Sequence, residues 1–360
     1  MTDTLNDQVK QAAGRLDEHV REMIRWHFDP HSGTPFWLEY ARQAGWNPLE
    51  QVQCFADLLR FEHFDDDALR FVPHEKLVPG PYKGLPFTVF ETGGTTGMPK
   101  QRIGWEDYQT DYADYARLLD DEIFPRGGYW LSMGPTGPRR LRLSLEYLAN
   151  QRGCSCYFID LDARWVKKLI ANKRYDEAKT YMEHVVDQTL IILKHRQVDA
   201  IFTTPKLLEA LSEKIDLPEE TQVKAVFCAG TEMNPQMVRF LIEEVLDNRI
   251  RFIPIYGNTL MGLATALPVT ARDNYSISYY PPQPRAVIRV VDPKNTDKLV
   301  DYGQWGRVEL TTLTRELFMP RFLERDEVAR RKPCESWPWD GVADVRPFGS
   351  SEKKVVEGVY

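Results

Sequence analysis

A short run rich in glycine, threonine and lysine is the part of this sequence best suited to binding a phosphorylated ligand. Residues 92–100 read Thr-Gly-Gly-Thr-Thr-Gly-Met-Pro-Lys and follow an apolar, β-prone segment at 85–90. Glycine lets backbone N–H groups approach a ligand closely, threonine adds hydroxyl donors, and Lys100 adds a cation. The spacing differs from that of a P-loop, in which lysine directly follows the last glycine. A surface turn is the alternative, but the ordered run through Met98, Pro99 and Lys100 favours an oligophosphate site.

This run resembles the phosphate loop of the acyl-adenylate-forming superfamily, which comprises acyl-CoA synthetases, peptide-synthetase adenylation domains and luciferases. Those enzymes join a carboxylate to ATP, which gives an acyl-AMP and pyrophosphate. The resemblance implies that the β- and γ-phosphates are held by Thr95, Thr96, Gly97 and Lys100. It also implies that the rest of the loop belongs to the nucleotide site, namely Thr92, Gly93 and Gly94.

A second segment, Tyr-Gly-Asn-Thr-Leu at 256–260, resembles the Tyr-Gly-x-Thr-Glu motif of the same superfamily. The resemblance places Tyr256 and Gly257 in the nucleotide site, with the tyrosine near adenine, and the Thr259 hydroxyl on the α-phosphate. Leu260 stands where the family has a glutamate that helps to hold Mg²⁺, and leucine cannot ligate a hard cation. We therefore expect ATP and Mg²⁺ as cofactors, with no protein ligand for the metal identified. Either Mg²⁺ rests on phosphates and water, or another carboxylate substitutes, or ATP turnover is impaired.

Two further segments complete the expected nucleotide site. The triplet Gly230, Thr231 and Glu232 follows a predicted strand and resembles the segment whose backbone cradles adenine. Residues 318–326 resemble the run that ends in an aspartate bound to both ribose hydroxyls, here Asp326. A carboxylate suits a vicinal diol because its two oxygens accept two hydrogen bonds. The alternative for Asp326 is an exposed place in a charged cluster, and the order of the motifs favours the ribose role.

Residues 348–358 resemble the hinge that leads to the mobile C-terminal domain of the superfamily, with Ser350 in place of the hinge arginine. The resemblance covers about residues 86–358 and implies the large N-terminal domain only, so we expect a truncated member without the C-terminal adenylation lysine. Two truncated groups fit this shape. They are the acyl-protein synthetases of bioluminescent bacteria and, closer in length, the adenylating proteins of phenazine antibiotic biosynthesis of the griseoluteic acid type.

The second group implies adenylation of an aromatic acid, a phenazine dicarboxylate, for reduction to an aldehyde by a partner reductase that uses the acyl-adenylate. Three alternatives stay open: a nucleotide- or acyl-binding scaffold without turnover, a thioester-forming ligase completed by a separate subunit, and an acyl-protein synthetase acting through a cysteine. Cys334 is the candidate acyl acceptor, and an unreactive thiol is its alternative. Four residues near the expected crevice are candidates for the acid pocket, although such residues are more often plain core: Trp130, Met133, Gly134 and Phe202.

The elements that must position these residues follow from the hydrophobic pattern. Helical periodicity fills most of 1–84, including an expected helix from Pro48 to about Phe61. Strand and helix patterns alternate over 85–270, which predicts a mostly parallel sheet flanked by helices, with ligand loops beyond the strand ends. Strand patterns dominate 271–360 and predict a β-rich, distorted barrel-like subdomain. The fold class is therefore α/β: a helical preface, an ATP- and acid-binding core, and a β-rich subdomain.

Composition limits the remaining classes. The 360 residues have a formal charge of −7 and a pI of about 5.6, which argues against a general nucleic-acid or membrane-surface binder. The five cysteines are at no metal-like spacing and indicate reduced thiols in a cytoplasmic protein. The N-terminus is polar, so no signal peptide is expected. The oligomeric state is left open, with a homodimer as one option.

Overall fold

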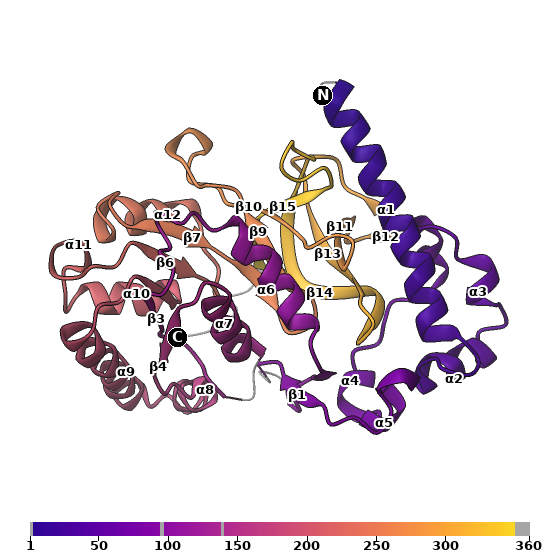
Figure 1. Cartoon of the computed structure of the whole chain (residues 1–360), viewed down its shortest axis with the longest axis horizontal. Helices are drawn as coiled ribbons and strands as arrows, with labels where there is room; N and C mark the ends of the chain where they lie inside the picture. The colour runs from indigo at the N-terminus through magenta and orange to yellow at the C-terminus, as the bar shows by residue number, and fades with distance from the viewer. Residues whose placement is uncertain (1–2, 94–96, 138–139, 350–360) are drawn as a thin grey trace.

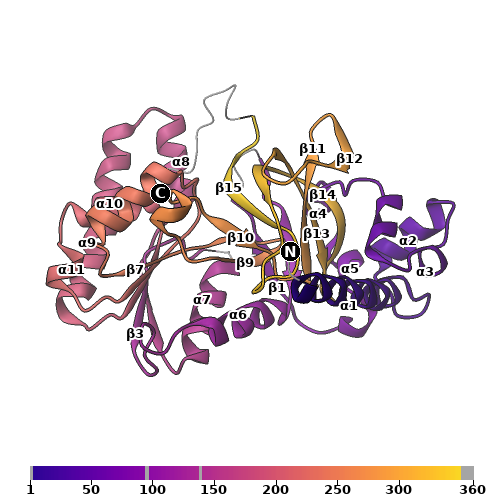
Figure 2. The ribbon, with the colours of Figure 1, turned by 90° about the horizontal axis from the view of Figure 1, so that it is seen from above.

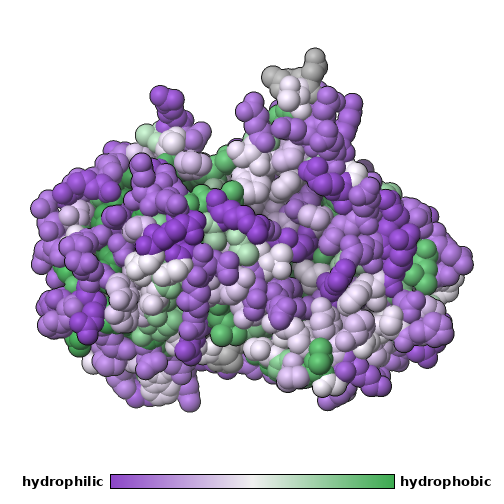
Figure 3. Space-filling model, viewed as in Figure 1, coloured by the Kyte–Doolittle hydropathy of each residue, from purple (hydrophilic) through white to green (hydrophobic). Residues whose placement is uncertain are grey.

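The structure is a computed structural model, and it describes residues 3–93, 97–137 and 140–349. Three regions lie side by side in Figure 1: helices of the N-terminal part, a central antiparallel sheet, and a parallel sheet with its helices. Within the described chain, none of the helices is both long and apolar enough to cross a membrane. On the face in Figure 3, apolar side chains form small groups between hydrophilic ones.

The N-terminal region is helical and packs on the antiparallel sheet. Its elements are α1 (Asp3–Phe28), α2 (Pro35–Gln43), α3 (Pro48–Gln51), η1 (Phe55–Arg60), α4 (Ala68–Phe71), α5 (His74–Leu77) and η2 (Gly80–Tyr82). Apolar residues of α1 and α2, such as Val20, Ile24 and Trp37, share one core with Leu313 and Phe318 of the sheet. The helices therefore have no separate core of their own.

The single helix expected from Pro48 to Phe61 is wrong. It is divided into α3 and η1, because the chain is extended at Val52 and Cys54. The Asp57 carboxylate accepts the backbone N–H groups of Gln53 and Cys54 at 2.9 and 3.1 Å, and so begins a new helical turn there. A helical hydrophobic pattern does not reveal this side-chain cap.

His27 on α1 is buried, although nothing in the sequence pattern indicated an interior place for it. Its Nε2 lies 2.8 Å from the carbonyl oxygen of Thr314, so this nitrogen must be the donor. Its Nδ1 lies 2.7 Å from the Thr34 hydroxyl, which donates to it. Burial lowers the pKa of His27 to about 4, and the ring is therefore neutral at pH 7.

The five-stranded parallel sheet has the order β4-β3-β5-β6-β7 and helices on both faces (Figure 2). Its strands are β3 (Tyr129–Ser132), β4 (Ser155–Phe158), β5 (Ala200–Thr203), β6 (Ala225–Cys228) and β7 (Arg251–Pro254). Its helices are α6 (Asp107–Leu118), α7 (Arg140–Gln151), α8 (Ala163–Ala171), α9 (Tyr175–His195), α10 (Pro205–Ser212), α11 (Leu217–Glu220) and α12 (Pro235–Phe240), which continues into a π-helical turn, η3 (Leu241–Val245). Alternate strand residues face two different cores, because side chains alternate along a strand.

The eight-stranded antiparallel sheet has the order β12-β11-β13-β14-β15-β10-β9-β8. Its strands are β8 (Tyr256–Asn258), β9 (Gly262–Ala266), β10 (Ser278–Tyr280), β11 (Ala286–Asp292), β12 (Asn295–Leu299), β13 (Trp305–Leu313), β14 (Phe318–Arg331) and β15 (Gly341–Pro347). A short 3₁₀ turn, η4 (Ala271–Asp273), lies between β9 and β10. The sheet therefore begins at Tyr256, earlier than the boundary near residue 270 expected from the sequence, because β8 follows β7 almost directly.

A bulge in β14 shapes the side of this sheet nearest the candidate site. Arg307 of β13 pairs with Glu327, and Glu309 pairs with Leu323. One residue of β13 thus opposes three of β14, Glu324 to Asp326. Bulges of this kind redirect side chains and are frequent beside functional sites.

Candidate functional site

The glycine-threonine loop joins two antiparallel strands, β1 (Thr88–Glu91) and β2 (Gln101–Gly104). It thus joins the strands of a hairpin, and β2 separates it from α6. Two hydrogen bonds close its base: Thr92 N–H donates to the Lys100 carbonyl at 3.0 Å, and Lys100 N–H donates to the Thr92 hydroxyl at 3.1 Å. Gly94, Thr95 and Thr96 lie outside the described residues. Gly97 has a φ of +127°, a region that favours glycine.

The Lys100 ammonium is buried and already has a partner. Its Nζ lies 3.2 Å from Asp66 Oδ2 and 4.4 Å from the centre of the Phe322 ring. Asp66 also pairs with Arg70 at 2.8 Å. A phosphate that recruited Lys100 would therefore compete with Asp66 for the ammonium.

Hydrogen bonds to backbone N–H groups and to backbone carbonyl oxygens hold the turn at residues 258–261 in place. Asn258 Oδ1 accepts the N–H groups of Leu260 and Met261 at 2.9 and 2.8 Å. Arg102 donates to the carbonyl oxygens of Thr259 and Leu260 at 2.9 and 2.8 Å. The Leu260 side chain is 1% exposed and belongs to the core. The residue in the place of the metal glutamate is thus a packing residue.

Tyr256 and Asp326 meet across the β-rich sheet. The Tyr256 hydroxyl donates to Asp326 Oδ2 at 2.8 Å. Burial raises the pKa of Asp326, although the bond from Tyr256 and the charge of Lys100 act in the opposite direction. Gly257 has no room for a side chain, because a Cβ there would clash with the carbonyl oxygen of Gly262.

A cavity of about 270 Å³ brings three of the predicted segments together. Its lining includes Gly230, Thr231, Glu232, Tyr256, Gly257 and Asp326, together with residues 344–347 of β15. Of the loops expected beyond the strand ends, those at Gly230 and Gly257 line the cavity, whereas Thr92 and Gly134 are not among its lining residues.

The residues that line this cavity suit a nucleoside. Gly230 has a φ of +93°, so its backbone turns where most residues could not. The hydroxyl oxygen of Thr231 is buried without a hydrogen-bond partner among the described residues, and such an atom is satisfied by a polar ligand. Tyr256 adds an aromatic ring and Asp326 a carboxylate that can accept two hydroxyl groups. The volume is near the lower limit of about 300 Å³ for small-molecule pockets.

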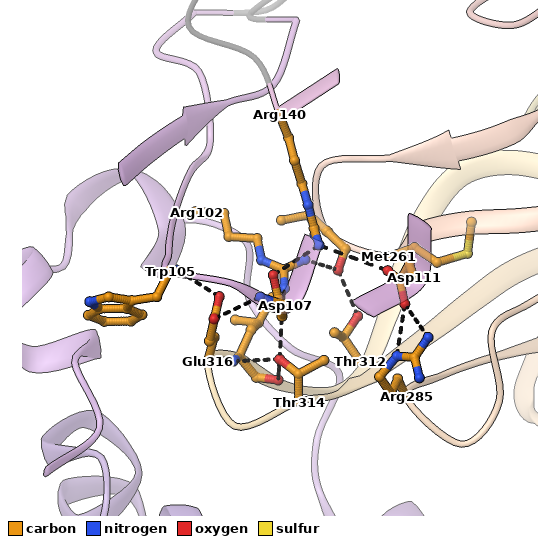
Figure 4. Close-up of polar contacts among 12 residues, drawn as sticks. Arg102, Trp105, Asp107, Asp111, Arg140, Met261, Arg285, Thr312, Thr314 and Glu316 are labelled. Atoms are coloured by element: carbon orange, nitrogen blue, oxygen red, sulfur yellow. Dashed lines mark hydrogen bonds and ion pairs between the residues drawn. The ribbon is translucent and has the colours of Figure 1, made fainter. Parts of the chain in front are cut away.

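A buried network of charged residues, which the sequence did not indicate, joins the start of α6 to Arg102, Arg140 and Glu316 (Figure 4). The Asp107 carboxylate, at the start of α6, binds Arg102 and also binds Arg140 at 2.9 Å. Burial alone would raise the pKa of Asp107, but the two arginines outweigh it and the pKa is lowered. Arg140 also approaches the Thr259 carbonyl at 3.4 Å. The network therefore supports the turn that carries Thr259.

Glu316, on the loop between β13 and β14, binds the first turn of α6. Its oxygens accept the N–H groups of Trp105, Glu106 and Asp107 at 2.9, 2.6 and 2.9 Å. A carboxylate is stabilising at a helix N-terminus, where N–H groups lack partners. Burial and the Asp107 charge nevertheless raise the pKa of Glu316 to about 7. The bond joins residues 209 to 211 positions apart, so local sequence patterns could not have revealed it.

One cluster of carboxylates and one single carboxylate are candidates for holding a metal ion. Asp65, Asp66 and Asp67 have oxygens within 4.8 Å of one another, but Arg70 binds two of them and Lys100 binds Asp66. The second is Glu324 on the β14 bulge, near Lys100. Its Oε1 accepts from the Asn258 amide at 3.0 Å.

The remaining predicted residues lie elsewhere. Trp130, Met133 and Phe202 are buried in the two cores of the parallel sheet, so the structure does not place them on the cavity. Gly134 is buried, with open space where a Cβ would project. Cys334 follows the C-terminal end of β14, where Arg331 pairs with Gly341 of β15. Asp326 pairs with Pro347, at the opposite end of the pairing between β14 and β15. The structure therefore does not bring Cys334 to the cavity.

The structure is similar to crystal structures of 2-hydroxyisobutyryl-CoA ligase. For the postadenylation state with R3-HIB-AMP, the TM-score is 0.65 at 16% identity, and the match covers 93% of this chain and 67% of the ligase. For the thioesterification state with 2-HIB-AMP and CoA, the TM-score is 0.63 at 17% identity, with 94% and 68% covered. No family model matches the sequence, and no curated protein matches it. The expected α/β fold class, a mostly parallel sheet flanked by helices together with a β-rich subdomain, is confirmed.

Proposed function

We propose that this protein adenylates a carboxylic acid with ATP, giving an acyl-AMP and pyrophosphate. The observation that carries the proposal is the cavity in which Gly230 to Glu232, Tyr256 and Asp326 meet. Their chain order is that of the superfamily motifs, and the phosphate-loop hairpin ends at Lys100, close enough to Asp326 to influence its pKa. The likeness to a ligase whose structures contain acyl-AMP supports the same conclusion.

In the proposed reaction, the side chains act by position and charge. Asp326 accepts the ribose hydroxyls, and Thr259 donates to the α-phosphate. Lys100 exchanges Asp66 for the outer phosphates, where a cation stabilises the charge that develops on pyrophosphate. A carboxylate oxygen of the acid attacks the α-phosphorus in line, and the bond to the pyrophosphate oxygen breaks. Mg²⁺, when bound, would neutralise phosphate charge, and Leu260 cannot hold it.

The proposal extends to the identity of the acid and to the enzyme that consumes the acyl-AMP. The sequence resemblance implies a phenazine dicarboxylate, activated for a partner reductase, and it is the only support for that acid. The aromatic residues expected near the crevice lie in the core, so they add nothing to it. Activity is proposed for the adenylation half-reaction.

The test is ATP–pyrophosphate exchange with a panel of aromatic, hydroxylated and fatty acids. We expect exchange with at least one acid, and loss of exchange in Asp326→Ala. Phenazine dicarboxylate in the panel tests the identity of the acid, and added reductase should then draw the acyl-AMP to aldehyde. Exchange with none of the acids, although ATP binds measurably, would contradict adenylation.

That outcome would favour a second function, nucleotide binding without turnover. The observation behind it is that Leu260 is a core residue and that Lys100 is held by Asp66. A scaffold of this kind would bind ATP and leave it intact. Calorimetric ATP binding together with the exchange assay separates the two functions.

A further inference from the structure

The bulge in β14 places an unusual carboxylate beside the turn that has lost its metal ligand. Glu324 and Asp326 both lie in the bulged stretch opposite Val308. Glu324 Oε1 accepts from Asn258, the residue two positions before Leu260, at 3.0 Å. The acidic group missing from the turn at position 260 is thus supplied to the same turn from another strand.

The surroundings of Glu324 leave its charge incompletely compensated. Among the residues that the structure describes, its second oxygen accepts one bond, a long one of 3.4 Å from the Arg325 N–H. No ion pair within 4.0 Å involves it among residues 3–93, 97–137 and 140–349. Burial raises the pKa of Glu324 to about 7, the charge of Asp326 acts in the same direction, and Lys100 opposes both. A half-buried carboxylate without a close cation is costly, and a bound cation would relieve that cost.

We propose that Glu324 is the protein ligand of the divalent cation that accompanies ATP, in place of the glutamate that Leu260 replaces. The inference rests on the proposed function, because it presumes a nucleotide in the adjoining cavity. A Mg²⁺ ion is commonly held by one or two carboxylates, with phosphate oxygens and water completing its octahedron. Glu324 therefore suffices as a single ligand.

The geometry gives the two oxygens of Glu324 different roles. Oε1 is held by the Asn258 amide, which fixes the orientation of the carboxylate, as outer hydrogen bonds do at metal sites. Oε2 is then the oxygen available to a cation. Lys100 lies near enough to affect the pKa values of both Glu324 and Asp326. A phosphate between Lys100 and a cation on Glu324 would be neutralised from two sides.

The other carboxylates nearby are less suitable. Asp326 is bound by Tyr256 and has the ribose role. Asp66 and Asp67 are bound by Arg70, and Asp66 also by Lys100. An ion at the acidic turn would have to displace those cations, so this turn is the rival in the test.

The experiment measures how Mn²⁺ and a non-hydrolysable ATP analogue, α,β-methylene-ATP, strengthen each other's binding. Calorimetry gives the affinity of the analogue in Mn²⁺ and in EDTA, and electron paramagnetic resonance counts bound Mn²⁺. We expect Glu324→Gln to reduce the Mn²⁺-induced gain in affinity by about tenfold, within the usual range of coupling between ligands. In EDTA, the same variant should bind the analogue slightly more tightly, because a carboxylate that repels phosphate is gone.

Glu327→Gln is the matched control, since it makes the same change on the same strand at a carboxylate bound to Arg346. It should keep the wild-type gain. Loss of the gain in Asp66→Asn but not in Glu324→Gln would overturn the inference in favour of the acidic turn. An unchanged gain in both would overturn it in favour of a cation held by phosphates alone.

If the wild type binds the analogue neither in Mn²⁺ nor in EDTA, the proposed function and the inference are both wrong. This outcome is distinct from the outcomes above, which overturn the inference alone. Circular dichroism checks the fold of each variant. If Glu324→Gln does not fold, Glu324→Asp provides the second test, because a shortened carboxylate should keep a reduced gain and the matched Glu327→Asp should keep all of it.

Discussion

Replacing Asp107 by asparagine should destabilise this protein strongly, because two buried arginines depend on that carboxylate. The side chains of Arg102, Arg140 and Asp107 are 1%, 5% and 9% exposed. An asparagine at this position would keep the shape but not the charge, and two guanidinium groups would lose their shared anion. Breaking a buried ion pair by removing one partner costs about 3–5 kcal/mol, a large part of a total stability of about 5–15 kcal/mol.

The ionisation of Glu316 determines whether the loss of stability lies at the lower or the upper end of that range for a broken ion pair. The Asp107 charge is one of the causes that raise the pKa of Glu316 to about 7, so removing it should let Glu316 ionise and restore part of the lost negative charge. We therefore expect the lower end, about 3 kcal/mol. The pH dependence should change too. A carboxyl whose pKa is 4.5 when unfolded and about 7 when folded loses stability as pH rises through that interval. This loss should be smaller in Asp107→Asn.

The assay is urea denaturation at several pH values between about 4.5 and 8, which span both pKa values of Glu316, with Asp114→Asn as the control. Asp114 pairs with Arg117 at 2.6 Å and Arg285 at 3.1 Å, but its side chain is 50% exposed. Exposed pairs contribute about 0–1 kcal/mol, so the control should be nearly neutral. A similar small effect of both substitutions would refute the reasoning, because the network would then be no more than a set of surface pairs.

Three further predictions concern other residues. The neutral, buried His27 has a pKa of about 4 when folded and 6.5 when unfolded, so about 3 kcal/mol of stability should be lost as pH falls from 6.5 to 4. Urea denaturation measures this loss, and an equal loss in His27→Gln would contradict the prediction. Asp326→Ala should weaken ATP binding at least about tenfold in calorimetry, since two hydrogen bonds to a carboxylate contribute about 1.5–3 kcal/mol each; binding within about twofold of wild type would exclude the ribose role. Lys100→Met should weaken ATP binding, whereas Asp66→Asn should strengthen it by freeing the ammonium; shifts in the same direction would show that Asp66 does not restrain Lys100.

Local sequence signals predicted local structure well. The helical pattern after residue 162 is interrupted at Lys173, which adopts a φ of +58° between α8 and α9. Asn234, a residue type that favours helix starts, caps α12, since its side chain accepts the Met237 N–H at 2.9 Å. These features depend on a few neighbouring residues, and the residue types alone report them.

Features that depend on distant partners were not predictable in the same way. The sequence placed Thr231, Tyr256 and Asp326 in one site only through their resemblance to a family, and not through any periodicity. Nothing local marks Arg102 or Glu324, because their roles come from a core contact and a strand bulge formed with residues far along the chain.

The contact between α1 and the β13–β14 loop has a consequence for synthesis of the chain on the ribosome. His27 and the Thr314 carbonyl that it binds are 287 residues apart. At about 5–20 residues per second, roughly 15–60 s pass before the partner of the first helix exists. During that time, Val20, Ile24 and Phe28 have no sheet to cover them. Helix α1 is therefore synthesised well before the sheet that buries its apolar face, and that face is exposed on the nascent chain in the meantime.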